Sequence, residues 1–157
     1  MKKQKLLRLL LSVVVLLSVL PLAGMASPEA APAAPARSPA EYEAQGFQPL
    51  SDGLYWKLEG RRLTIGGVGE MEDYSFENRP PWDAAPMDIT VLVIEEGVRS
   101  IGTRAFDGCG LLSTADLPES LVSIGSAAFE GCTNLTDLHL PAGITSIGES
   151  AFRDRNY

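Results

Sequence analysis

The residues of this sequence that could carry out chemistry are few and widely spaced. His139 is the only histidine, and the pattern of the chain would place it beside Asp116 of the preceding coil, with Asp137 two residues earlier on its own strand. A Ser-His-Asp hydrolase needs a nucleophile beside the imidazole and a third group that orients the base. Ser113 and Thr114 fall nearby in the pattern, but neither a nucleophile elbow nor an oxyanion site accompanies them. The sequence therefore predicts no catalytic residues and no enzyme.

The acidic and glycine-rich stretches lack the spacing of metal and cofactor sites. Asp116 and Asp137 offer oxygen ligands suited to calcium, yet no calcium-loop motif surrounds them. The run Gly66-Gly67-Val68-Gly69 lacks the third glycine of the dinucleotide fingerprint, and no helical pattern follows it, so it indicates a tight turn. Neither CxxC spacing nor a cluster suited to zinc occurs. We expect neither a metal nor a cofactor.

The two cysteines, Cys109 and Cys132, lie 23 residues apart. In an exported protein such a pair could form a disulfide. Side chains at equivalent positions of stacked coils project in parallel, however, whereas a disulfide needs a crossed geometry. A free cysteine also packs well as a small apolar side chain. A disulfide and two buried thiols therefore both stay open as interpretations.

The same distance of 23 residues organises the chain over residues 89–157. One pattern is written three times there, as residues 89–111, 112–134 and 135–157. A constant period with constant residue types indicates a solenoid, in which each coil buries its apolar side against the next. We expect rows of inward side chains, with about 4.8 Å between coils as in paired strands. These rows are Ile89/Leu112/Leu135, Leu92/Ala115/Leu138, Ile94/Leu117/Leu140, Val98/Leu121/Ile144, Ile101/Ile124/Ile147 and Phe106/Phe129/Phe152.

Side chains between the inward ones on the first strand of each copy point outward and form the predicted interaction surface. A solenoid sheet commonly presents such a face to partners. The preceding segment could cover the two valines of the first copy, and a merely solvated surface is the alternative to a binding one. The outward positions are Val91, Val93, Thr114, Asp116, Asp137 and His139.

A second face of the solenoid carries Ser-Ile-Gly in every copy. The glycines of this triplet are Gly102, Gly125 and Gly148. A glycine at a constant phase indicates either a positive φ or a close approach between neighbouring coils. Both are structural roles, so we assign no ligand to this face.

The chain before the repeats begins with the features of an export signal. Four basic residues within the first eight precede an apolar run over 9–22, and small residues at 24 and 26 suit a signal peptidase. The run is shorter than a membrane span, so we expect cleavage after Ala26 and a secreted or cell-surface location, with an uncleaved anchor as the alternative. Loss of the signal changes the net charge from −7 to −11. Phosphate backbones repel such a protein, so nucleic acid is not an expected partner, and only the signal segment before cleavage should meet the membrane.

Residues 27–88 are expected to connect the signal to the repeats and to close the solenoid at its N-terminal end. Residues 27–46, rich in proline and alanine, predict a disordered linker. Within the capping segment 47–88, two alternating runs around a glycine-containing turn predict a β-hairpin whose apolar face lies on the first repeat. The apolar and proline-rich remainder predicts an irregular cover over that end. An aromatic ligand pocket around Tyr74 and Trp82, suited to a sugar ring, is the alternative.

The repeat Leu-x-x-Leu-x-Leu-Pro-x-x-x-x-x-Ile-Gly-x-x-Ala-Phe-x-x-Cys resembles the BspA-like leucine-rich repeats of bacterial surface proteins. The lead-in is similar to that family too, with Leu63-Thr64-Ile65, Gly69-Glu70-Met71 and Pro81-Trp82 ahead of the first repeat. The resemblance implies a right-handed leucine-rich-repeat solenoid of mostly β and irregular structure, with a short parallel β-sheet and 23-residue coils. It also implies secretion or surface display, and adhesion to proteins or host surfaces.

We therefore expect a non-enzymatic repeat protein that binds an extracellular protein or glycan through its outward sheet face. The alternative is the N-terminal fragment of a larger secreted protein, in which the repeats position an enzyme or another domain. In the third copy Asp154-Arg155 replaces the Gly-Cys pair of the first two, which suggests the front part of a longer array. An open last coil would also permit self-association through its unpaired strand edge.

Overall fold

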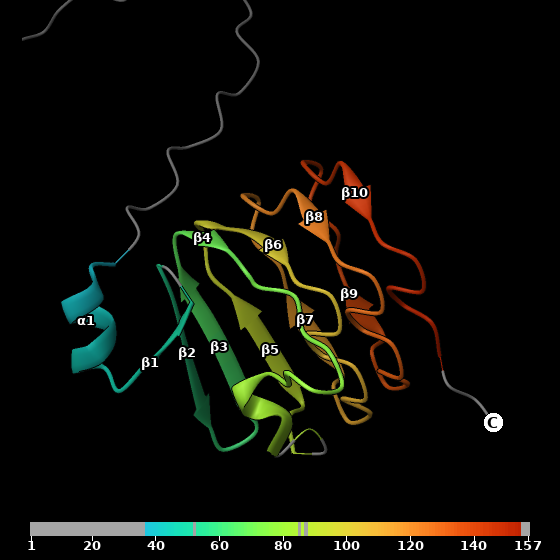
Figure 1. The fold of residues 1–157 in the computed structure, drawn as a ribbon, viewed down its shortest axis with the longest axis horizontal. Helices are drawn as coiled ribbons and strands as arrows, with labels where there is room; N and C mark the ends of the chain where they lie inside the picture. Colours follow the sequence, from blue (N-terminus) through green and yellow to red (C-terminus); the bar gives the residue numbers. More distant parts are fainter. Residues whose placement is uncertain (1–36, 52, 85, 87, 155–157) are drawn as a thin grey trace, which may run out of the picture. The chain divides into compact units, whose positions relative to one another are not determined.

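The computed structural model describes residues 37–51, 53–84, 86 and 88–154. The predicted signal peptide and residues 27–36 of the predicted linker lie outside this part of the chain. The described chain holds one α-helix, one short 3-10 helix and ten strands in two sheets (Figure 1). Its secondary structure is thus mostly β and irregular, as predicted. Within these ranges, no helix combines the length and the apolar character needed to span a bilayer.

The first sheet contains one strand from each repeat and continues into the segment before the repeats. Val91 lies opposite Thr114, and Thr114 lies opposite Asp137, so each step across the sheet advances the chain by 23 residues. These pairs are parallel, as expected for the coils of a solenoid. In spatial order the strands are β1 (Gln48–Ser51), β2 (Leu54–Glu59), β3 (Arg62–Gly67), β5 (Val91–Ile94), β7 (Thr114–Asp116) and β9 (Asp137–Leu138).

The second sheet is formed by the strands that follow β3, β5, β7 and β9 along the chain. Ser100 lies opposite Ser123, and Ser123 opposite Ser146, in the same parallel register. Each coil therefore contributes one strand to each sheet, and Figure 1 shows the coils side by side in chain order. The strands are β4 (Gly69–Glu70), β6 (Val98–Ile101), β8 (Ser123–Ile124) and β10 (Ser146–Ile147).

Close approach between coils explains the glycine that ends the second strand of each coil. Gly125 does not have a positive φ. A Cβ built on Gly125 would lie 2.7 Å from the carbonyl carbon of Gly102, and one on Gly148 would lie 2.6 Å from that of Gly125. Left-handed backbone occurs a little further along each coil instead, with φ of 55°, 55° and 58° at Arg104, Ala127 and Ser150.

The predicted inward rows form the core in the first two copies, where most members are fully buried. The third copy differs. Leu140 and Ile147, both predicted to point inward, are 39% and 48% exposed. The prediction of burial is wrong for these two side chains, because no described coil lies over this side of the third copy.

The phenylalanines of the repeat form a continuous stack through the core. Phe106 and Phe129 have ring centroids 5.2 Å apart, and Phe129 and Phe152 have centroids 5.4 Å apart. Trp82, on the 3-10 helix η1 (Pro81–Ala84), continues this stack on Phe106. Its indole Nε1 donates a hydrogen bond to the carbonyl of Ala105 at 2.8 Å, so the buried polar atom is satisfied.

The segment before the first repeat makes one additional turn of the solenoid. β3 pairs parallel with β5, with opposite residues 29 apart in sequence, and β4 pairs parallel with β6, where a register shift gives separations of 29 and 30. The hairpin of β2 and β3 therefore joins the sheet edge to edge and does not lie upon the first repeat, which corrects that expectation. Trp82 and Tyr74 are only 2% and 4% exposed. Neither ring is accessible, so the alternative of a sugar pocket there is wrong.

A short helix replaces the end of the predicted linker. α1 (Pro39–Ala44) begins after Ser38, whose backbone N–H donates to the Glu41 carboxylate at 2.6 Å, and proline is favoured in a first helical turn. Tyr42 of this helix is 1% exposed. The prediction of a disordered linker is therefore wrong over residues 39–44, because a buried tyrosine anchors them.

Cys109 and Cys132 are both buried free thiols. Sγ of Cys132 donates to the carbonyl of Phe106 at 3.2 Å. Burial raises the pKa of the Cys109 thiol to about 12, and burial raises that of Cys132 as well. The structure therefore agrees with the interpretation of two buried thiols and not with the disulfide.

Candidate functional site

The outward face of the first sheet presents the side chains that point away from the core. Along β5, Val91 and Val93 are half-buried and alternate with the fully buried Leu92 and Ile94. The same alternation continues on β7 and β9, so the predicted outward positions are outward in the structure. Thr114 is half-buried, whereas the exposed positions are Asp116, Asp137 and His139.

The strand register arranges this face in two rows that run across the coils. In the first row Arg62 lies opposite Val91, which lies opposite Thr114, which lies opposite Asp137. The second row is formed by Lys57, Thr64, Val93 and Asp116 in the same way. Both rows end with an aspartate. The second row begins with Lys57, whereas the first continues past Arg62 to Glu59 on β2, and Lys57 pairs with Glu59 at 2.7 Å.

The outward face is therefore graded in character from one end to the other. Arg62 is exposed, the two valines form an apolar centre, and Asp116 and Asp137 make the far end acidic. An apolar centre with charged ends is the usual arrangement of a protein-binding patch.

The face shows no arrangement suited to catalysis or to metal binding. His139 directly follows β9, and in the described part of the chain its imidazole forms no hydrogen bond or ion pair with Asp116 or Asp137. The predicted proximity of these residues thus produces no charge-relay pair. Among the residues that the structure places, no group of three or more His, Cys, Asp or Glu side chains could hold a metal ion.

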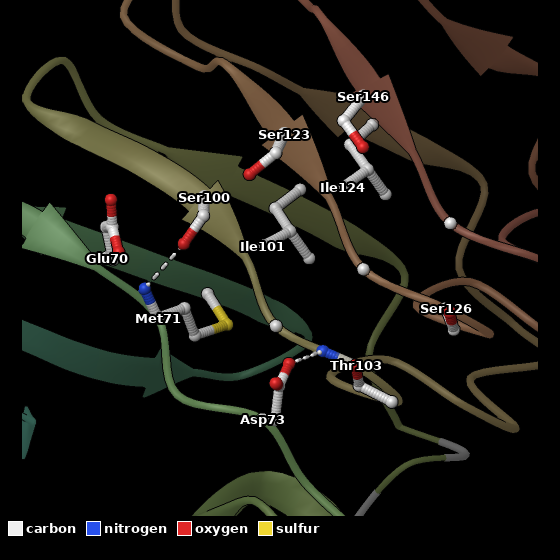
Figure 2. Close-up of a pocket in the computed structure, with 13 residues that line it drawn as sticks. Glu70, Met71, Asp73, Ser100, Ile101, Thr103, Ser123, Ile124, Ser126 and Ser146 are labelled. Atoms are coloured by element: carbon white, nitrogen blue, oxygen red, sulfur yellow. Dashed lines mark hydrogen bonds between the residues drawn. The ribbon is translucent and has the colours of Figure 1, made fainter.

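A second surface lies over the other sheet, where a shallow groove of about 410 Å³ crosses β4, β6, β8 and β10. Figure 2 shows Ser100, Ser123 and Ser146 following one another along it. The hydroxyl of Ser100 accepts a hydrogen bond from the backbone N–H of Met71 at 3.1 Å. At the edge of the groove, Asp73 accepts from the N–H of Thr103 at 2.6 Å, and this bond lowers the pKa of the Asp73 carboxyl. The Asp73 carboxylate and the Ser100 hydroxyl therefore link the segment before the repeats to the first repeat.

Residues 85–157 carry a repeat pattern that is known from other proteins. The family model described as "BspA type Leucine rich repeat region (6 copies)" matches residues 85–157. Residues 85–157 belong to the BspA-type leucine-rich repeat family. The predicted resemblance is confirmed, and the match begins four residues before the first predicted copy. None of the curated proteins compared with the chain matches it.

Two solved structures of leucine-rich repeat proteins are similar to this chain. A leucine-rich repeat protein from Eubacterium ventriosum is 25% identical with a TM-score of 0.58, over 66% of this chain and 28% of that one. The T. pallidum leucine-rich repeat protein is 20% identical with a TM-score of 0.39, over 68% of this chain and 66% of that one. The first comparison agrees with the solenoid fold. The chain thus spans about a quarter of the length of the E. ventriosum protein.

Sequence reasoning missed the element that borders the outward face of this BspA-type repeat region. Tyr42 of α1 stacks on Tyr55 of β2 at the edge of the face, with ring planes inclined by 6°. The signal was present as Ser38-Pro39-Ala40-Glu41, a serine followed three residues later by a glutamate, which is a helix-start motif. The high proline and alanine content of the preceding residues concealed it.

Proposed function

We propose that this chain is an exported, non-enzymatic repeat protein that binds an extracellular protein or glycan through the outward face of its first sheet. The observation that carries the proposal is the pair of rows with an apolar centre at Val91 and Val93 and an acidic end at Asp116 and Asp137. Such a surface offers apolar area bordered by acidic side chains that would complement basic groups of a partner. Because no sugar-stacking aromatic lies among the predicted outward positions, the face suits a protein better than a glycan.

Export is the second part of the proposal and rests on the N-terminal sequence. The basic residues, the apolar run and the small residues up to Ala26 have the order of a secretory signal. The BspA-like resemblance points in the same direction, because it implies bacterial proteins that are secreted or displayed at the surface. Expression in a bacterial host with mass determination of the exported chain tests this, since cleavage after Ala26 gives a mature protein that begins at Ser27.

Binding through the outward face is tested with purified extracellular matrix proteins and glycans arrayed on a surface. The double variant Asp116→Lys/Asp137→Lys reverses the acidic end of the rows, and Val91→Asp disrupts the apolar centre. Glu149→Lys is the matched control, because Glu149 is an exposed acidic residue outside both rows. We expect the row variants to lose at least tenfold in affinity for any ligand found and the control to bind as the parent does. Equal binding by all variants would remove the outward face from the proposal.

A second candidate function follows from the coverage of the E. ventriosum protein. Because the chain spans 28% of that protein, the repeats could instead position another domain of a longer secreted protein. Reading the genomic DNA downstream of the codon for Tyr157 tests this candidate. Further in-frame repeats favour adhesion, and an in-frame enzyme domain favours the positioning role.

A further inference from the structure

Residues 37–47 fold back over one end of the outward face and contact it through three kinds of interaction. The guanidinium of Arg37 lies 3.1 Å from the carboxylate of Glu95, which directly follows β5. Nζ of Lys57, on β2, donates to the backbone carbonyl of Gln45 at 2.7 Å. The ring of Tyr42 lies between these two contacts in sequence and is the most deeply buried part of the segment.

The sheet provides a shaped site for the Tyr42 side chain. The ring stacks on Tyr55 with centroids 4.8 Å apart, and its hydroxyl donates to Oε2 of Glu95 at 2.8 Å. Gly66 lies beneath, where a Cβ would come within 2.6 Å of the tyrosine hydroxyl and would also meet the Glu95 carboxylate. Tyr55 offers a surface for stacking, Glu95 accepts from the hydroxyl, and Gly66 leaves room because it has no side chain. Together these features favour a phenol ring.

The segment itself contributes little to its own conformation. α1 has six residues, and an isolated helix shorter than about 12 residues is marginal in water. Its geometry therefore depends on the contacts with β2, β3 and the end of β5. Contacts to a side chain, a backbone carbonyl and a charged group are those by which proteins recognise peptides.

We propose that β2, β3 and β5 carry a peptide-binding site for a tyrosine-bearing segment, which residues 37–47 fill as an internal ligand. The site is formed by Tyr55, Lys57, Gly66 and Glu95. An external polypeptide that offers a tyrosine in a short helical segment would compete with α1 for it. This inference shares Lys57 with the second row of the outward face, but it does not depend on the binding role of Val91, Thr114 and Asp137 proposed above.

The test uses the full chain, a Tyr42→Ala variant and a synthetic peptide of residues 37–47 supplied separately. We expect the variant to bind the peptide at least tenfold more tightly than the unaltered chain, in which the site is already occupied. A peptide with alanine in place of its tyrosine should not bind. Gly66→Ala in the Tyr42→Ala background should abolish binding of the native peptide, because the added methyl group fills the place of the ring.

Equal affinity of the unaltered and Tyr42→Ala chains for the peptide, or binding that survives loss of its tyrosine, would overturn the proposal. So would the absence of any binding to a folded Tyr42→Ala chain. If circular dichroism shows that Tyr42→Ala does not fold, Tyr42→Phe replaces it, since that change keeps the ring and removes the hydroxyl that donates to Glu95. The phenylalanine variant should bind the peptide at least threefold more tightly than the unaltered chain, and a smaller difference would equally overturn the site.

Discussion

The indole of Trp82 and the ring of Phe106 stack with centroids 5.6 Å apart and planes inclined by 17°. Trp82 lies outside the repeats, yet it takes the place in the core that a phenylalanine takes in each repeat. The aromatic stack thus runs from the turn before the repeats to Phe152 without interruption. The four predictions below follow from this stack and from the contacts between neighbouring coils.

Phe129→Ala should be strongly destabilising, because Phe129 is 1% exposed and stacks between Phe106 and Phe152. Removal of a buried phenylalanine side chain costs about 3 to 5 kcal/mol, which is comparable with the whole stability of a small domain. Urea denaturation followed by circular dichroism measures the loss. Phe76→Ala is the matched control, since Phe76 is 63% exposed, and it should cost less than about 1 kcal/mol. Similar losses for the two variants would contradict the assigned stack.

Gly125→Ala and Gly108→Asn should differ in cost because the two glycines are needed for different reasons. An added Cβ at residue 125 would meet the backbone of the preceding coil, and overpacking of this kind costs about 1 to 3 kcal/mol. Gly108 has φ of 81° with no atom within 4 Å of an added Cβ, and asparagine tolerates left-handed backbone. Gly108→Asn should therefore cost about 1 kcal/mol or less. Thermal unfolding compares them, and a larger loss for Gly108→Asn would refute the close-approach explanation.

Arg153→Ala should destabilise the contact between the second and third coils. The carboxylate of Glu130 is almost fully buried and pairs with Nε of Arg153 at 3.1 Å and, through its other oxygen, with Arg104 at 3.9 Å. Because Arg104 remains and the Arg153 side chain is mostly exposed, the loss should be about 1 to 2 kcal/mol.

A double-mutant cycle with Glu130→Gln measures the coupling between Glu130 and Arg153, expected at about 0.5 to 3 kcal/mol for residues in contact. The more accessible pair of Arg79 and Asp83 is the control, with an expected coupling below about 1 kcal/mol. Additive effects of Arg153→Ala and Glu130→Gln would show that the buried pair contributes nothing to coil stacking.

The two buried thiols should make the fold sensitive to alkali. The folded-state pKa of Cys109 is raised to about 12 from an ordinary 9.0, so folding favours the protonated thiol. The contribution of the protonated Cys109 thiol to the free energy of unfolding is fully present below about pH 9 and is lost as the pH rises toward about 12. The variant Cys109→Ala/Cys132→Ala should lose less stability than the parent between about pH 8 and pH 10, as measured by urea denaturation at each pH. Thiol titration in the absence of reductant supplies the control. Both thiols should react in the denatured protein and neither in the native protein, whereas no reaction after denaturation would reveal a disulfide.

Much of the fold could be predicted because the 23-residue period repeats the same packing problem three times. Leu92, Ile101 and Phe106 occupy equivalent phases to Ala115, Ile124 and Phe129, and the structure buries all of them. The outward positions follow from the two-residue alternation of a strand, so Val91, Asp116 and Asp137 could be placed as well. Exposure of Leu140 and Ile147 could not be predicted from phase alone, because burial depends on a neighbouring coil.

The contacts before the repeats could not be predicted because they occur once and have no period. Gly66 looked like part of a tight turn, and its role became clear only with Tyr42 lying above it. Trp82 was expected to cover the end of the solenoid, whereas a 29-residue turn brings it into register with the phenylalanines. In each case, residues distant in sequence define the environment.

The constant 23-residue step of the sheet, from Val91 to Thr114 to Asp137, has a consequence for how such a gene can change. Unequal recombination between two copies removes or adds a whole coil and rejoins the chain at the same phase. The strand of the coil next to the junction pairs with the same backbone groups as before, and its phenylalanine stacks on the same kind of neighbour. Array length can therefore vary by whole coils without any new packing solution, while the outward residues of each copy diverge independently.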